Sequence, residues 1–453
     1  MKWLASIVVI FTISVFFVIF LFGWMHANID SYFYYAFGEF VRTGTYPFQP
    51  PFVYTRPTTI SPPLYGLFFT FTHNLPRADI LLHAIQLLLL AATAHILYKT
   101  LRLHLAQRYA IVVSCLFALL PVNLVYAGNV MTENSSQFAV MLIVYLLATG
   151  NASTAALVAS IGTLLKYNLG IYVPLAFVYF LKKPKRSVYP ILGMFLLTSW
   201  MLINHSITGV WGLYDTRGTQ LYNQFVAQTK FLPPETDPSL IRMRQLLPPG
   251  TDVAVPYWDI QEQLSEKLGH EWTKIDQALF DVSWASVRSH PIEYLLHSLK
   301  NYALIHYDHV PHWRNVGNIG VAGLSGTDAP FCGSLGSVKI CQPIIKTPRS
   351  YQLWNAFVRS EMRLFEALAT PLFYLLFLPS LCVALLSAKR LPRLYAFLYL
   401  GGTVPIAFTI HADPRYVVPF YPLAVLIIVT ALQDASNVIG NIRKRDHKDD
   451  RYK

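Results

Sequence analysis

Two carboxylates lie beside apolar runs, where a charged side chain is costly. Asp30 follows the first apolar run of the chain, and Glu133 begins another run in "GNVMTENSSQ". A carboxylate in such a place either caps or begins a helix, because a helix N-terminus favours an acid, or it serves as an acid, base or ligand in a cavity of a membrane protein. Both readings are open for each acid from its position alone.

Single cations lie in comparable places. Lys166 interrupts an apolar stretch in "LLKYNLG", Arg415 precedes the last apolar run in "HADPRYVVPFYP", and Arg56 lies in the first loop. A lone cation between apolar helices either reaches lipid headgroups or binds an anion. Arginine binds phosphate with two parallel hydrogen bonds, and lysine neutralises it as a point charge. Carboxylates with several cations therefore indicate a substrate that carries a hydroxyl to deprotonate and a phosphate to release.

The composition places these residues in a membrane protein. The chain has 453 residues, of which 54% are hydrophobic and 13% charged, and its mean hydropathy is +0.40, whereas soluble proteins have about 25% charged residues. The net charge of +12 is divided among short clusters between apolar runs, which is typical of cytoplasmic loops. We expect an all-α polytopic membrane protein with no nucleic-acid partner.

Apolar runs long enough to span a bilayer define the expected helices. They cover residues 4–22, 78–98, 109–126, 131–149, 187–205, 365–387, 391–410 and 415–433. Residues 152–181 are apolar with a break at "LKYNLG" and predict either two short spans or a re-entrant pair. Residues 4–22 fit a retained helix or a cleaved signal peptide, and the absence of a small-residue cleavage site after them favours the retained helix.

Four basic clusters fix the orientation of these helices. They are "YKTLRLHLAQR", "KKPKR", "AKRLPR" and the tail "RKRDHKDDRYK", and the positive-inside rule places them in the cytoplasm. A chain with both termini in the cytoplasm and about ten crossings satisfies all four clusters. Asp30, Arg56, Glu133, Lys166 and Arg415 then all lie on the extracytoplasmic side. This common side favours a cavity over unrelated helix caps.

The topology also divides the chain into segments. Residues 1–205 form an N-terminal transmembrane core with a long first loop at 23–77, residues 206–364 an extracytoplasmic segment, residues 365–434 the C-terminal transmembrane helices, and residues 435–453 a basic cytoplasmic tail. In the extracytoplasmic segment, Cys332 and Cys341 are the candidates for a disulfide, since an oxidising compartment would allow a bond across this spacing. Residues 290–307 carry a helical apolar stripe, which fits either an interfacial helix on the outer leaflet or a helix of a small domain.

Several motifs together resemble a known superfamily. "DSYFYYAFGEFVRTGTYP" resembles the first-loop signature of the GT-C glycosyltransferases, which include the protein O-mannosyltransferases and the lipid A aminoarabinose transferases. "YTRPTTISPPLYGLF" resembles the basic, proline-rich passage that follows it, and "GNVMTENSSQFAVMLIVYLLA" an acid-bearing helix entrance. "INHSITGVWGLYDTRGTQLYNQ" and "DPRYVVPFYPLAVLI" are similar to the region after a middle span and to the last helix. The resemblance covers most of the membrane part and implies a GT-C-like bundle.

The resemblance implies roles for individual residues. Asp30 would be the catalytic base of an inverting sugar transfer from a polyprenyl phosphate, or would orient the acceptor. Arg56 would lie near the donor phosphate, and Glu133 would be a second cavity acid and a candidate ligand of a divalent metal. Asp30 is followed by Ser31 rather than by a second acid, which leaves the metal open and no cofactor assigned.

The remaining candidates come from the topology for Lys166 and Arg415, and from the motifs that carry the resemblance for Tyr34, Asn204 and His205. We expect Lys166 and Arg415 to bind the donor phosphate, and Tyr34, Asn204 and His205 to line the cavity or hold the acceptor.

The sequence thus predicts a glycosyltransferase of the plasma (inner) membrane with an extracytoplasmic active site. Its expected partners are a polyprenyl-phosphate sugar donor, the bilayer, and a lipid, glycan or protein acceptor. A transporter or lipid flippase is the alternative from another class, and it predicts polar residues throughout the depth of the spans. A ligase or polymerase using a diphosphate-linked donor is a second enzymatic alternative.

Overall fold

The computed structural model describes most of the chain, and every element in the described part is a helix. The described residues are 29–44, 62–72, 75, 78–127, 131–181, 188–214, 216–269, 271–307, 373–409 and 414–449. The predictions for residues 4–22, Arg56, Cys332 and Cys341 lie outside these ranges. The all-α fold class is confirmed for the described residues.

The N-terminal part contains the helices α2 (Ile29–Thr43), α3 (Pro63–Thr72), α4 (Ala78–Leu101), α5 (Gln107–Ala118), α6 (Pro121–Ala127), α7 (Glu133–Ala148), α8 (Ala152–Leu165), the 3-10 helix η2 (Tyr167–Ile171), α9 (Tyr172–Leu181) and α10 (Val188–Thr208). The middle part contains α11 (Arg217–Leu221), the π-helical turn η3 (Tyr222–Val226), α12 (Ala227–Thr229), α13 (Pro238–Leu246), α14 (Tyr257–Lys267), α15 (Trp272–Ser289) and α16 (Pro291–Tyr307). The C-terminal part contains the π-helical turn η5 (Phe373–Phe377), α19 (Leu378–Leu386), α20 (Arg390–Thr409), the 3-10 helix η6 (Pro414–Phe420) and α21 (Tyr421–Asp449).

Among the described residues, three helical segments are long and apolar enough to cross a membrane. They are Ala84–Leu101, Val188–Thr208 and Tyr416–Asn437, and they coincide with three of the predicted runs. Shorter apolar helices cover Gln107–Ala118, Glu133–Ala148, Ala152–Leu165 and Leu375–Leu386. The predicted run at 109–126 is divided between α5 and α6, because Pro121 cannot continue the helix that ends at Ala118.

A single large core joins the apolar helices. Leu97 of α4, Ile143 of α7, Tyr172 of α9 and Tyr399 of α20 are all fully buried in it. Small residues allow close packing, as membrane bundles require: a Cβ atom added to Gly193 of α10 would lie 2.6 Å from the Ser160 hydroxyl of α8. The apolar runs of the sequence therefore pack on one another over part of their surface.

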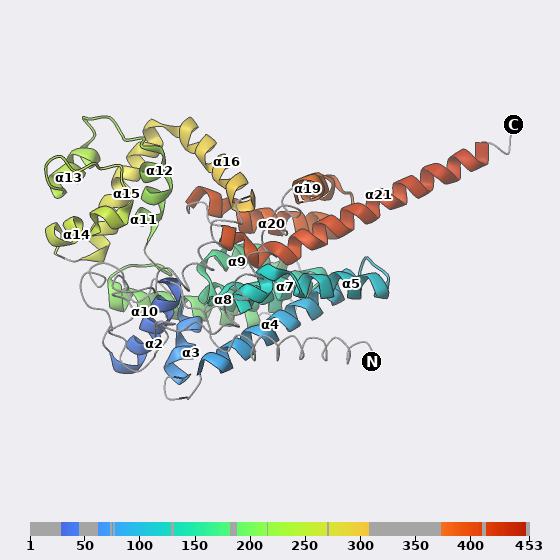
Figure 1. The fold of residues 1–453 in the computed structure, drawn as a ribbon. Coiled ribbons are helices and arrows are strands. Elements are labelled where there is room, and N and C mark those ends of the chain that lie inside the picture. The colour runs from blue at the N-terminus through green and yellow to red at the C-terminus, as the bar shows by residue number, and fades with distance from the viewer. Residues whose placement is uncertain are drawn as a thin grey trace, which may run out of the picture.

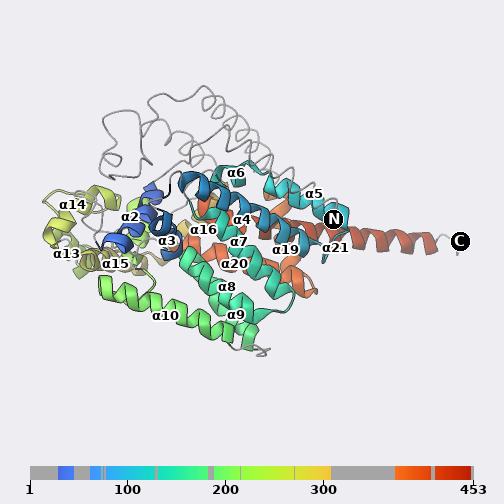
Figure 2. The same cartoon turned by 90° about the horizontal axis from the view of Figure 1, so that it is seen from below.

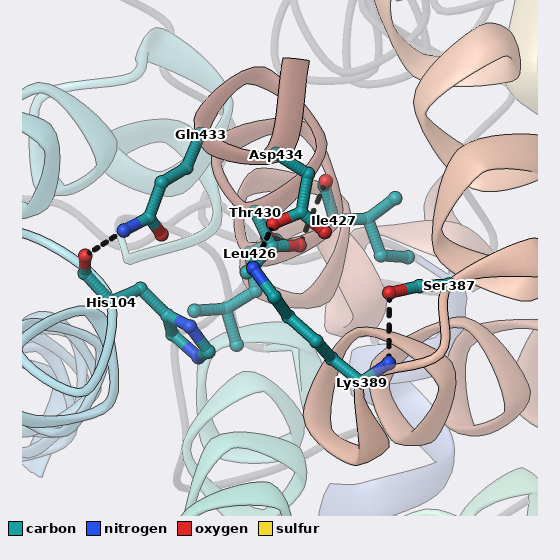
Figure 3. A network of polar contacts seen from close by, with 8 residues as sticks. All are labelled: His104, Ser387, Lys389, Leu426, Ile427, Thr430, Gln433 and Asp434. Atoms are coloured by element: carbon teal, nitrogen blue, oxygen red, sulfur yellow. Dashed lines mark hydrogen bonds and ion pairs between the residues drawn. The ribbon is translucent and has the colours of Figure 1, made fainter. Parts of the chain in front are cut away.

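The two ends of this bundle differ (Figures 1 and 2). In both views α2, α3 and α13–α15 lie at one end, and α5 and the last turns of α21 lie at the other. Figure 3 shows contacts near the α5 end: Gln433 donates to the His104 carbonyl at 2.6 Å, and Lys389 pairs with Asp434. His104 also bonds the Tyr395 hydroxyl at 3.0 Å. The basic clusters at 99–108 and 389–393 therefore lie at the same end, as the charge-based topology requires.

Residues 216–290 form a small helical unit with its own core. Tyr222, Leu240, Tyr257 and Leu279 are buried in that core. The "TDPS" sequence starts α13, because Asp237 accepts a hydrogen bond from the Ser239 amide at 2.8 Å and Pro238 occupies the first helical position.

The fully buried Asp276 of α15 caps α11 from a distance. Its carboxylate accepts hydrogen bonds from the amides of Gly218 at 2.9 Å and Thr219 at 2.8 Å, and from the Thr219 hydroxyl at 2.8 Å. Since the first amides of a helix have no partner within it, a carboxylate there stabilises α11.

Asp276→Asn is expected to lower the free energy of unfolding by about 1.5–3 kcal/mol. The amide NH2 group of the asparagine would face a backbone N–H of Gly218 or Thr219, and neither donor could then be satisfied in this buried place. The thermal unfolding midpoint of the protein in detergent measures this loss. Asp259→Asn, at an exposed position in the first turn of α14, is the control and should lower the midpoint much less, since only an exposed helix-dipole interaction is lost. Equal midpoints for the two variants would contradict the capping role.

Candidate active site

A buried ion pair marks the end of the bundle where α2 and α3 lie. Glu133, the first residue of α7, and Lys166, which ends α8, are joined at 2.9 Å between Nζ and Oε1. The side chains are 1% and 10% exposed. Two of the cavity residues predicted separately from the sequence are therefore direct partners. Each neutralises the charge that would make the other costly to bury.

Lys166 owes its position to the break that the sequence predicts. Its backbone is extended, with φ −153° and ψ 115°, between the end of α8 and the start of η2. Its ammonium also lies 5.7 Å from the centre of the Tyr416 ring of η6, which is within reach of a cation–π interaction. Arg415 precedes Tyr416 in η6 and so lies at this end of the bundle, although its side chain is outside the described part of the structure.

The start of α7 holds η6 in place. Gln137 donates to the Asn123 side-chain oxygen at 2.7 Å and to the Val418 carbonyl at 3.0 Å, and Asn134 donates to the Asn123 carbonyl at 3.2 Å. All three amide side chains are fully buried. The polar sequence "TENSSQ" thus supplies an internal connection between α6, α7 and η6.

A tyrosine pair connects α2 to the same cluster. The rings of Tyr34 in α2 and Tyr65 in α3 meet edge to face at 4.8 Å, and Gln86 of α4 donates to the Tyr65 hydroxyl at 3.0 Å. Burial raises the pKa of Tyr65 well above its usual range, and the nearby Tyr34 and Glu133 raise it further. Tyr65 is therefore a neutral phenol in this cluster.

The position of Asp30 follows from α2. The helix begins at Ile29, so Asp30 lies in its first turn rather than before it, where a negative charge is favoured by the helix dipole. Tyr34 lies four positions after Asp30, which places both residues on one face of α2. The backbone of Asp30 therefore lies one turn from the cluster. Its side chain is outside the described part of the structure.

Two glycines bring α2 and α3 together. A Cβ atom at Gly66 would lie 2.5 Å from Cδ1 of Phe37, and one at Gly38 would lie 2.8 Å from the Gly66 carbonyl. Thr70 bonds the Gly38 carbonyl at 3.1 Å. The distance between the helices, and with it the position of Asp30, depends on the absence of side chains at this crossing.

Gly66→Ala is expected to cost about 1–3 kcal/mol of stability, since the added methyl overlaps a ring that is buried. Gly162→Ala is the control, because a Cβ atom there would meet its nearest neighbours at an ordinary 3.4 Å. Thermal unfolding of both variants in detergent tests the crossing, and a Gly66→Ala protein with the midpoint of the wild type would contradict it.

Asn204 and His205 lie near the end of α10 and contact the turn that follows it. Asn204 is fully buried and donates to the Gly212 carbonyl at 2.8 Å, and the His205 ring stacks on Trp211 at 4.1 Å. Tyr214, in the same turn, stacks on Tyr167 at 4.5 Å, next to Lys166. The turn therefore packs against the residue that follows Lys166. The predicted contact of Asn204 and His205 with an acceptor remains a prediction.

Some buried polar atoms near the pair have no partner among the described residues. They are Oε2 of Glu133 and both side-chain polar atoms of Asn168, which lies two residues after Lys166. Unpaired buried polar atoms are costly and typically bind water or a ligand. Sequence reasoning missed Asn168, Tyr65, Gln86 and Tyr416, although "LKYNLG" and "RYVVPFYP" contain two of them.

The described side chains around Glu133 do not support a metal site there. Among the described residues no three His, Cys, Asp or Glu side chains come together as metal ligands, and one Glu133 oxygen is bonded to an ammonium group. A metal prefers several anionic or neutral donors without such a cation. We therefore derive no step through a metal.

No protein-family model, curated protein or solved structure matches this chain.

Proposed function

We propose that the chain is an integral membrane glycosyltransferase that takes a sugar from a polyprenyl-phosphate carrier. The observation that carries the proposal is the convergence at one end of the bundle of the first turn of α2, the buried Glu133–Lys166 pair and η6 with Arg415. These elements supply the two kinds of group that the reaction needs: a carboxylate for a hydroxyl and cations for a phosphate.

The reaction assigns a task to each group. The Asp30 carboxylate takes the proton of the acceptor hydroxyl, whose oxygen bonds to the anomeric carbon of the sugar. The bond from that carbon to the phosphate oxygen breaks with inversion, and the polyprenyl phosphate leaves with both electrons. Arg56, Lys166 and Arg415 stabilise the charge on the phosphate, while Tyr34, Asn204 and His205 position the acceptor.

Glu133 holds the Lys166 ammonium in a fixed position. An ammonium with a carboxylate at 2.9 Å keeps two further N–H groups for a ligand. The bond to Glu133 also keeps Lys166 in place without a ligand. We assign Glu133 the task of holding Lys166 ready for the leaving phosphate.

The proposal places the active site on the extracytoplasmic face of the plasma membrane. About ten spans, a GT-C-like bundle and cytoplasmic termini complete it. The transporter alternative needs charged groups along a path through the bundle. Of the described Asp, Glu, Lys and Arg residues, only Glu133, Lys166 and Asp276 are buried, and the two in the bundle lie together at one end, which favours the enzyme.

Purified protein in liposomes, supplied with a labelled polyprenyl-phosphate sugar and membrane extract as the source of acceptor, tests the function. We expect label in a new product, and none with a sugar nucleotide as donor. Product only from a diphosphate-linked donor would favour the polymerase alternative. Movement of the labelled lipid between leaflets without any product would overturn the proposal in favour of a flippase.

A further inference from the structure

The helix α16 has polar residues inside and apolar residues outside. Its fully buried positions include Ser298 and Asn301, whereas Ile292 is 67%, Leu296 60% and Leu299 53% exposed. Leu295, between them on the same face, is 47% exposed. A helix at a water surface shows the opposite pattern, with its apolar stripe toward the core. The reversed pattern is that of a helix whose outer face meets lipid.

The inward polar face of α16 is bonded to the rest of the protein. His297 bonds the Gln224 carbonyl at 2.7 Å, and its Nε2 lies 3.1 Å from the Asn301 amide nitrogen. The hydroxyl of Tyr302 lies 3.3 Å from that of Thr403, and His306 bonds the Tyr399 hydroxyl at 2.7 Å. This face packs against η3 and α20. The leucine stripe on the opposite face therefore points outward.

In Figure 1, α16 runs from the end of α15 to α20, and contacts near both of its ends join it to α20. Tyr294 donates to the Phe408 carbonyl at 2.5 Å, and His306 lies against Tyr399. Residue numbers rise along α16 while those of the contacted residues fall along α20, so the two helices are antiparallel. From Tyr294 to His306 the rise is about 18 Å, more than half of a bilayer core of about 30 Å.

The helix α20 lies at the depth of a candidate span. Its beginning is tied to the far part of the Tyr416–Asn437 segment through Lys389 and Asp434, and Gly402 packs against the Phe420 ring. These two contacts align α20 with the span along its length. A helix packed on the half of α20 next to η6 lies at the depth of the corresponding half of the span.

One charged side chain of the exposed face fits this placement. Lys300 is exposed beside Leu299. Since Cα–Cβ bonds in a helix point toward its N-terminus, the Lys300 side chain leans toward the Pro291 end of α16. A lysine can reach the headgroups in this way while its methylene chain stays in lipid.

We propose that α16 is inserted into the extracytoplasmic half of the bilayer, with Ile292, Leu295, Leu296 and Leu299 against lipid acyl chains. This placement replaces the helix lying flat on the outer leaflet that the apolar stripe alone suggests. It is independent of the proposed sugar transfer, because only the packing of α16, α20 and α21 supports it.

The test is a spin label at Ile292, Leu296 or Leu299, one at a time, in a cysteine-free protein reconstituted into liposomes. Collision with oxygen, which concentrates in lipid, and with a water-soluble nickel chelate is measured for each label. The exposed Lys274 of α15 is the water control, and Leu202 of α10, 51% exposed within a candidate span, is the lipid control. A label that disturbs folding at one position is moved to Leu295.

We expect labels at Leu296 and Leu299 to match Leu202, with the ratio of oxygen to nickel collisions rising from Ile292 to Leu299. Nickel access equal to that at Lys274 would overturn the proposal. So would one shallow depth at all three positions, which a flat interfacial helix requires, or low access to both reagents, which would show that protein covers the stripe.

Discussion

Asp30→Asn is expected to lower the rate of sugar transfer by about 10²–10⁴-fold, the usual contribution of a general base. The amide cannot take the proton of the acceptor hydroxyl. Its shape is that of the carboxylate, so binding of donor and acceptor should persist, and kcat should fall with little change in KM. Steady-state kinetics with labelled donor in detergent or liposomes measures both constants.

The same variant separates catalysis from a helix-terminal role. Asp30 lies in the first turn of α2, and loss of its charge there costs about 0.3–1 kcal/mol through the helix dipole, which is too little to unfold the protein. Glu39→Gln, near the other end of α2 in an ion pair with Arg42, is the matched control and should keep normal kinetics. Normal transfer by a folded Asp30→Asn protein would eliminate Asp30 as the base.

Breaking the Glu133–Lys166 pair is expected to have the second large effect. Glu133→Gln leaves a buried ammonium without its counter-ion, and Lys166→Met leaves a buried carboxylate alone. Loss of one partner of a buried pair costs about 3–5 kcal/mol. Each single variant should therefore have a clearly lower thermal unfolding midpoint in detergent. The double variant should recover most of the lost stability, because no unpaired charge remains.

The double variant also tests the function of the pair. If Lys166 binds the leaving phosphate, transfer remains low in the double variant although the fold is restored. Recovery of transfer together with stability would show that the pair is structural only. Single variants as stable as the wild type would contradict the burial of the pair. Lys274→Met, which removes an exposed pair with Glu271, provides the baseline for a surface ion pair.

The helices of the described chain could largely be predicted from apolar runs. The expected run at 187–205 became α10, the expected break at Lys166 became η2, and residues 290–307 became the helix α16. The run at 109–126 was wrong as one helix, because a count of apolar residues ignores Pro121. An apolar run shows only that a segment is hydrophobic. Residues such as proline, which cannot continue a helix, determine where each helix ends.

The site could be predicted only in part. Charge topology placed Glu133 and Lys166 on one side, but their direct bond joins residues 33 positions apart and depends on how α7 packs against α8. Tyr65 and Gln86 gave no signal, because a tyrosine and a glutamine among apolar residues become meaningful only through their partners. The apolar stripe of α16 was visible in the sequence, whereas the burial of Ser298 and Asn301 behind it was not.

The most direct test of the central claim is mass spectrometry of lipids extracted from the protein purified without added lipid. The account predicts a polyprenyl phosphate or its sugar conjugate with the wild type, and far less with the folded Glu133→Gln/Lys166→Met double variant. Ordinary phospholipids alone, in equal amounts from both proteins, would contradict the claim that this end of the bundle binds a lipid-linked sugar phosphate.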